Sequence, residues 1–112
     1  MEANRKEIRI YLTSDSKAPF TDWLHKLRDI KARAKIRIRI DRLGLGNYGD
    51  CQSVGEGVSE LRIDYGPGYR VYFGDDGETL IILLSGGTKK KQQKDIKQAQ
   101  EYWNDYKSRK NE

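Results

Sequence analysis

The chain has 112 residues, 36% hydrophobic and 35% charged, with a formal net charge of +5 at pH 7. This length predicts one domain spanning residues 1–112, because typical domains have ~100–150 residues. The longest apolar run, Leu80 to Leu84, is far shorter than the ~18 residues that a transmembrane helix requires, so no membrane partner is expected. A single cysteine, Cys51, permits no internal disulfide, and residues 1–10 lack the apolar segment of a secretory signal. We therefore expect a cytoplasmic protein.

Charge is unevenly distributed along the chain. Residues 1–50 carry a balance of +5, residues 51–87 carry −4, and residues 88–112 carry +4. Lysine and arginine displace counterions from nucleic acids, so basic blocks around an acidic centre suggest a face that binds phosphate. Solvated helix faces would have the same composition, and charge alone does not separate the two interpretations.

The first half of the chain predicts one strand and two helices. Residues 7–13 alternate well enough for a strand. Pro19 suits the first position of a helix, in which Phe20, Trp23, Leu24 and Leu27 form an apolar stripe. The segment from Ile30 to Gly46 fits both periods, since its isoleucines alternate with arginines but also recur at helical spacing. We interpret it as a helix that ends at Gly44, because strong helix formers fill the positions between.

The second half predicts three strands and a final helix. Residues 58–65, 69–74 and 79–85 are rich in β-branched and aromatic residues, with glycine-containing turns between them. Residues 90–107 have helical spacing. We therefore predict an α+β fold in the order β-α-α-β-β-β-α, with an antiparallel β-sheet, two N-terminal helices and one C-terminal helix. One face of this sheet is expected to bury five side chains: Trp23, Leu27, Ile36, Ile40 and Ile96.

Two familiar types of site are not supported by the sequence. The residues from Gly44 to Gly49 match the G-x-G-x-x-G pattern, but they follow a helix instead of joining a strand to one, so the context for dinucleotide binding is missing. With one histidine, one cysteine and no suitably spaced carboxylates, no metal site is predicted, and no cofactor is expected.

A group of cations is the strongest candidate for a functional site. Arg62 and Arg70 lie on adjacent predicted strands, and a guanidinium pair on one face could clamp a phosphate. Lys89, Lys90 and Lys91 follow the third strand, where unpaired N–H groups at the start of the last helix add positive potential. In the alternative interpretation the two arginines form ion pairs that hold the sheet together. The carboxylates available for those pairs are Glu56, Glu60 and Asp64.

The sequence also resembles a known family. The run V-S-E-L-R-I-D-Y-G-P-G-Y-R-V-Y-F at residues 58–73, followed by S-G-G-T-K-K-K-Q-Q-K-D-I at residues 85–96, resembles the RelE/ParE toxin superfamily. The nearest branch is the HigB-like addiction module killer proteins of type II toxin–antitoxin systems. The segments D-W-L at residues 22–24 and R-I-D-R-L-G-L-G-N at residues 39–47 extend the resemblance over nearly the whole chain.

This resemblance implies a RelE-like fold and a reaction. RelE-like and HigB-like toxins are ribosome-dependent mRNA endonucleases that need no metal: the RNA 2′-hydroxyl attacks the adjacent phosphate, and basic residues stabilise the added charge. By motif position the catalytic candidates are Arg62, Arg70, Lys89 and Lys90. The candidates for binding RNA phosphates are Lys91, Gln93 and Lys94. The implied partners are the ribosome, its mRNA and a cognate helix-turn-helix antitoxin.

The sequence departs from the family pattern where a general acid or base is expected. Many relatives carry a histidine or tyrosine near the last helix, but Gln92, Gln93 and Asp95 stand here and the nearest tyrosine is Tyr102. Asp95, or a lysine with a lowered pKa, could take that role. Two other functions therefore remain open: a ParE-like inhibitor of DNA gyrase without catalysis, and a degenerate toxin that only binds antitoxin or RNA.

Overall fold

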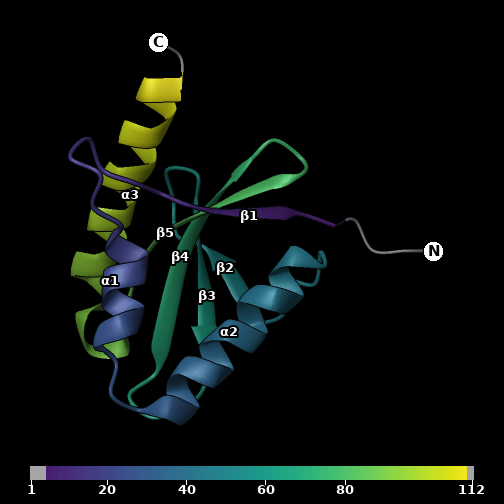
Figure 1. Cartoon of the computed structure of the whole chain (residues 1–112), viewed down its shortest axis with the longest axis vertical. Helices are drawn as coiled ribbons and strands as arrows, with labels where there is room; N and C mark the ends of the chain where they lie inside the picture. The colour runs from purple at the N-terminus through teal and green to yellow at the C-terminus, as the bar shows by residue number, and fades with distance from the viewer. Residues whose placement is uncertain (1–4, 111–112) are drawn as a thin grey trace.

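The computed structural model describes residues 5–110; residues 1–4 and 111–112, the ends of the expected domain, lie outside the described residues. The fold is α+β, with a five-stranded mixed sheet and three α-helices (Figure 1). In chain order the elements are β1 (Glu7–Ile10), α1 (Pro19–Lys26), α2 (Ile30–Gly44), β2 (Cys51–Ser53), β3 (Val58–Ile63), β4 (Tyr69–Asp76), β5 (Leu80–Thr88), the short 3₁₀ helix η1 (Lys89–Lys91) and α3 (Gln92–Lys110).

The strands lie in the order β1-β5-β4-β3-β2, and β3, β4 and β5 form the antiparallel series that the sequence predicts. The prediction of a wholly antiparallel sheet is wrong, because β1 pairs in parallel with β5. A parallel pair needs a long connection between its strands, and here the whole chain from α1 to β4 supplies it. β2 is a further strand that the sequence analysis did not expect; it is three residues long and pairs with β3 at the other edge of the sheet.

The ambiguous segment is helix α2, as we predicted. Ala32, Ile36 and Leu43 are buried on one face of it, whereas Ile38, which a strand would place on the same face as Ile36, is 48% exposed. Asp29 caps the helix by accepting hydrogen bonds from the backbone N–H groups of Lys31 and Ala32 at 3.0 and 3.2 Å. The helical period therefore decides which isoleucines enter the core.

Helix α2 ends at Gly44, as predicted, but the left-handed glycine that follows the helix is Gly46. Gly46 has φ +85°, and its N–H donates to the carbonyl of Leu43 at 2.9 Å, while the N–H of Asn47 donates to the carbonyl of Arg42 at 2.9 Å. These two bonds make a Schellman motif, which places a left-handed glycine just past the helix. Gly44 is the last helical residue and packs against the side chain of Ile8.

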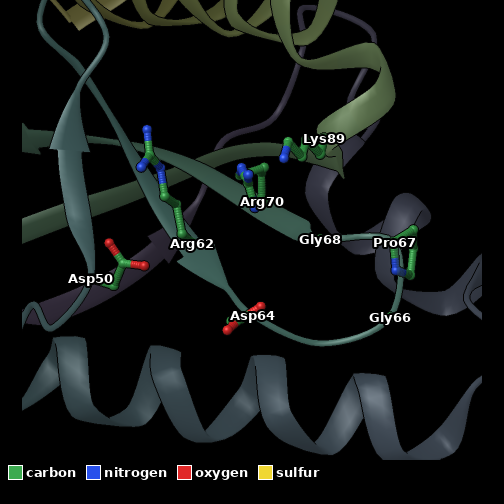
Figure 2. A pocket seen from close by; sticks show the side chains of 8 residues that line it. All are labelled: Asp50, Arg62, Asp64, Gly66, Pro67, Gly68, Arg70 and Lys89. Carbon is green, nitrogen blue, oxygen red and sulfur yellow. The ribbon is translucent and has the colours of Figure 1, made fainter.

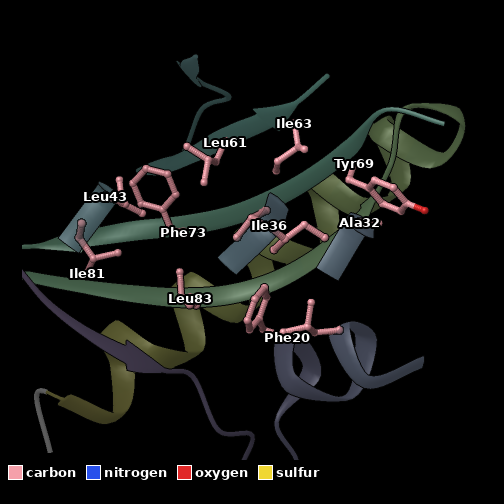
Figure 3. Close-up of a cluster of buried hydrophobic side chains, with 12 residues drawn as sticks. Phe20, Ala32, Ile36, Leu43, Leu61, Ile63, Tyr69, Phe73, Ile81 and Leu83 are labelled. Atoms are coloured by element: carbon pink, nitrogen blue, oxygen red, sulfur yellow. The ribbon is translucent and has the colours of Figure 1, made fainter. Parts of the chain in front are cut away.

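The hydrophobic core is divided between the two faces of the sheet, with α1 and α2 on one side and α3 on the other (Figure 1). Side chains alternate between the faces of a strand, so Val71 and Phe73 face α2, whereas Tyr72 faces α3. Figure 3 shows the cluster on the α1 and α2 side. Its buried members are Phe20, Leu24, Ala32, Ile36, Leu43, Leu61, Ile63, Tyr69, Val71, Phe73, Ile81 and Leu83.

The expectation that five named side chains bury against one face holds only in part. Ile36 is fully buried, and Trp23, Leu27 and Ile40 pack partly buried against the same cluster. Ile96 belongs instead to the opposite cluster, beside Ala99 and Trp103 of α3. Helical spacing within α3 shows which residues face a sheet, but it does not show which face of the sheet α3 covers.

Glycines let both indole rings approach the sheet backbone. A Cβ atom at Gly86 would lie 2.1 Å from the ring of Trp23, and one at Gly74 would lie 2.6 Å from the ring of Trp103. Such contacts are possible only without a side chain at the strand position. The helices α1 and α3 are thereby drawn close to the sheet at these points.

The Schellman motif yields a paired prediction. Gly46→Ala should lower the free energy of unfolding by about 1 kcal/mol, because alanine is strained in the left-handed region. Gly44→Ala should be neutral or should stabilise, because alanine favours the helix and the new Cβ would lie 3.4 Å from Ile8, at ordinary contact distance. Urea denaturation of both variants measures the difference; an equal loss from both would contradict the assignment of Gly46.

Candidate phosphate-binding site

Arg62 and Arg70 are direct cross-strand partners in β3 and β4. They lie on the face of the sheet covered by α3, since Val58 and Tyr72, at even positions of the same strands, belong to that cluster. Like charges directly opposite each other destabilise a strand pair. A cross-strand arginine pair therefore requires a nearby anion.

Glu60 is that anion. Its side chain has no exposure to solvent, and its Oε1 accepts a hydrogen bond from Arg62 Nε at 2.9 Å. The same oxygen lies 3.6 Å from Arg70 Nε. Gln92, the first residue of α3, donates to both carboxylate oxygens of Glu60 at 3.0 and 2.8 Å. The hydrogen bond to Glu60 raises the pKa of Arg62 above its usual value, so this guanidinium stays charged.

The alternative interpretation, in which carboxylates hold the arginines, is thus correct for Glu60. Glu56 is exposed at φ +57° in the turn between β2 and β3, and Asp64 is exposed after the end of β3. Within residues 5–110, the ion pairs of Arg62 and Arg70 are both with Glu60. One carboxylate for two arginines leaves an excess positive charge on this part of the sheet.

Arg70 is the more buried of the two arginines, with 8% of its surface exposed. Its Nη1 donates to the carbonyl of Tyr69 at 3.2 Å, but its buried Nε has no hydrogen-bond partner among the described residues, because the 3.6 Å to Glu60 is too long. Leaving a buried donor unpaired typically costs about 1–3 kcal/mol. Arg70 is therefore a nearly buried cation with unused hydrogen-bonding capacity.

A hollow of about 310 Å³ lies beside these arginines. It is lined by Asp50, Arg62, Asp64, Gly66, Pro67, Gly68, Arg70 and Lys89. Figure 2 shows Arg62, Arg70 and Lys89 side by side along one side of the hollow. Asp50 and Asp64 lie on its rim, toward helix α2. Three cations from three different elements therefore meet at one concave surface.

Backbone contacts bring Lys89 and Asp50 to this hollow. The N–H of Lys89 donates to the carbonyl of Gly68 at 2.8 Å, which ties the start of η1 to the turn between β3 and β4. Gly68 has φ +80°, and a Cβ there would lie 3.2 Å from Lys89 and 3.4 Å from Arg70 Nη1. On the other side, the N–H of Arg62 donates to the carbonyl of Asp50 at 2.9 Å.

The remaining predicted residues lie around a second hollow, of about 560 Å³, at the start of α3. Its lining comprises Lys89, Lys90, Lys91, Gln92, Gln93 and Lys94, and all of these side chains except Gln92 are exposed. Lys90 is thus grouped with Lys91, Gln93 and Lys94, and not with the arginines. Lys89 lines both hollows, so the two surfaces are continuous at this residue.

Two residues of the site, Asp50 and Gln92, were not predicted from the sequence as parts of it, and Glu60 and Asp64 were expected only as possible ion-pair partners of the arginines. Glu60 is two positions before Arg62, and this spacing places both side chains on one face of a strand, which was a usable signal. Gln92 and Asp50 come from distant segments, and no local pattern relates them to the arginines.

Asp95 lies on the α3 side of the sheet, against Gly87. A Cβ atom at Gly87 would be 2.0 Å from Asp95 Oδ2. Burial raises the pKa of Asp95, and Lys91 and Lys94 partly offset this increase. Gly87 is the cross-strand partner of Arg70, but neither hollow has Asp95 in its lining.

Other kinds of site are not evident in the part of the chain that the structure describes. No group of three or more His, Cys, Asp or Glu residues is placed to hold a metal ion among residues 5–110. None of the helices in that range is both long enough and apolar enough to cross a membrane.

Comparison with known proteins identifies a relative in Haemophilus influenzae (strain KW20 / Rd), described as an uncharacterized protein. The two sequences are 53% identical over 93 residues, which cover 83% of this chain and 88% of the relative. The chain belongs to the same family as this Haemophilus protein. No family model matches the chain.

The close packing at Gly87 allows a test of how α3 is positioned against β5. Gly87→Ala should lower the free energy of unfolding by about 2 kcal/mol, because the new methyl group overlaps the Asp95 carboxylate. In an Asp95→Ala background the same change should cost much less, since the overlapping atoms are gone. A double-mutant cycle in urea measures this coupling; additive losses would show that Asp95 is not what excludes a side chain at position 87.

Proposed function

We propose that this protein is the toxin of a type II toxin–antitoxin system, a HigB-like member of the RelE/ParE superfamily that cleaves mRNA on the ribosome. The observation that carries the proposal is the convergence of Arg62, Arg70 and Lys89 on one hollow of about 310 Å³. The resemblance of residues 58–73 and 85–96 to these toxins supplies the reaction. The finer assignment of the α+β fold as RelE-like is part of the same proposal.

The proposed chemistry needs cations more than any other group. The 2′-hydroxyl of the RNA loses its proton as its oxygen attacks the adjacent phosphorus. The bond from phosphorus to the 5′-oxygen breaks and that oxygen takes up a proton, so the products are a 2′,3′-cyclic phosphate and a 5′-hydroxyl. Negative charge grows on the phosphorus oxygens during this step. A preorganised donor aimed at that charge commonly contributes about 3–4 kcal/mol, and Arg70, a nearly buried cation that lines the hollow, is the best-placed group for this role.

The other residues have separate roles in this proposal. Arg62 and Lys89 hold the scissile phosphate from the two sides of Arg70, and Lys90, Lys91, Gln93 and Lys94 contact neighbouring phosphates along the second hollow. The carboxylates of Asp50 and Asp64 are at the rim of the first hollow. We assign the acceptor of the 2′-hydroxyl proton to one of these two and not to Asp95, which packs against Gly87.

The proposed partners are the ribosome, mRNA in its decoding site, and a helix-turn-helix antitoxin in the cytoplasm. The deciding experiment adds purified protein to an in vitro translation reaction and maps new mRNA ends, with a gyrase supercoiling assay in parallel. Cleavage within translated codons supports the proposal. Gyrase inhibition without new mRNA ends would favour a ParE-like function, and antitoxin binding without either activity would favour a degenerate toxin.

The first functional prediction concerns Arg70. Arg70→Ala should lower single-turnover mRNA cleavage by ~100-fold or more and abolish growth arrest, because the lost cation acts mainly in the transition state. Arg70→Lys should recover little, since an ammonium group cannot make a planar two-pronged contact. Arg28→Ala, at an exposed arginine between α1 and α2, is the matched control and should cleave normally. Growth arrest by Arg70→Ala at the wild-type level would contradict the catalytic role.

The second functional prediction concerns the attacking 2′-hydroxyl, the independence of cleavage from metal ions and the effect of salt on binding. An mRNA with a single 2′-deoxy nucleotide at the cleavage position should bind but resist cutting, because the attacking oxygen is missing. A brief EDTA pulse onto assembled complexes should leave the cleavage rate unchanged while the ribosomes remain intact. Binding should weaken steeply with added salt, since each phosphate contact releases counterions. Cutting of the deoxy-substituted mRNA at the same site would exclude the proposed step.

A further inference from the structure

Glu60 has no part in the chemistry proposed above, yet it is the most completely buried charged side chain of the site, with 0% exposure. It meets donors from three elements: Arg62 of β3, Arg70 of β4 and Gln92 of α3. A single oxygen, Oε1, faces the Nε atoms of both arginines, at 2.9 Å from Arg62 and 3.6 Å from Arg70. One oxygen therefore lies between the two guanidinium groups.

We propose that Glu60 is a positioning residue, which orients the Arg62 and Arg70 guanidinium groups toward the phosphate; this inference rests on the proposed function. A guanidinium that turns its Nε edge toward Glu60 directs its terminal Nη groups away from the carboxylate. In Arg62 one terminal group, Nη2, then donates to Gln52 Oε1 at 2.6 Å. Arg62 is thus held at both ends of its guanidinium, although its side chain is 33% exposed.

Stability alone is a weak reason for a carboxylate at this position. Replacing buried ionic groups by apolar residues of similar volume is often neutral or stabilising. An exposed arginine side chain otherwise samples many rotamers, and ordering it beforehand removes that entropic loss from the binding and reaction steps. Gln92 completes the arrangement, because its bonds to both carboxylate oxygens hold Glu60 in place and connect it to the start of α3.

The proposal predicts that loss of the Glu60 charge slows cleavage without weakening RNA binding. Glu60 places a negative charge beside the cations, so Glu60→Gln should leave RNA binding unchanged or tighten it. The same variant should slow single-turnover cleavage at saturating protein by roughly 10- to 100-fold, because misplaced catalytic groups typically lose that much. If Glu60 had only a structural role, its replacement would lower the free energy of unfolding, and the variant that remained folded would cleave at the normal rate.

Three variants separate charge from geometry. Glu60→Asp keeps the charge but shortens the side chain, so it should slow cleavage without tightening RNA binding. Gln92→Met removes the amide that fixes Glu60 while leaving all the charges, and should slow cleavage to a smaller extent; it also replaces Glu60→Gln as the test if that variant does not fold. Glu56→Gln removes the same charge at an exposed turn position and should cleave normally.

A spectroscopic arm tests the positioning itself, using nuclear magnetic resonance of the arginine Nε–H groups. In the wild type the Arg62 Nε–H signal should exchange slowly with solvent, and in Glu60→Gln it should exchange fast. If wild-type protein does not cleave mRNA, the proposed function fails, while this signal still decides whether Glu60 orders the guanidinium. A wild-type signal together with a wild-type cleavage rate in Glu60→Gln would overturn the inference.

Discussion

The buried carboxylate of Glu60 is the constraint on which the rest of the site depends. Two arginines stand directly opposite each other on adjacent strands, Arg62 on β3 and Arg70 on β4, an arrangement that repulsion disfavours unless an anion lies between them. Glu60 supplies that anion from the same strand as Arg62, and Gln92 fixes it from α3. One side chain thus supports the pairing of β3 with β4, the placement of α3 and the orientation of the cations.

Glycines determine how near the helices come to this part of the sheet. At the end of β5, Gly86 admits the indole ring of Trp23 on one face, and Gly87 admits the carboxylate of Asp95 on the other. The two neighbouring residues face opposite sides because side chains alternate along a strand. α1 and the first turn of α3 therefore both approach β5 just before Lys89, and this close approach places Lys89 at the edge of the arginine hollow.

The candidate site was partly predictable from sequence. The two arginines one hairpin apart and the lysines after β5 were identifiable because hairpin geometry relates residues that are close in the chain. The structure brings Lys89 to the arginines, whereas Lys90 lines only the second hollow, which Lys89 also lines. Asp50 and Gln92 were not predictable, because they reach Arg62 and Glu60 only through pairing between distant segments.

The sequence by itself determined the helical and strand periods, and with them the α+β class, the α2 helix and the three antiparallel strands β3, β4 and β5. These features depend on spacings of two to four residues and on short turns, which are local. Only the tertiary structure decided that β1 lies parallel to β5, that Ile96 packs on the face opposite Ile36, and that Gly46, just past the end of α2, is the glycine in the left-handed conformation. The first two depend on contacts between segments far apart in the chain. The third depends on one backbone dihedral angle, which two nearby glycines could each have adopted.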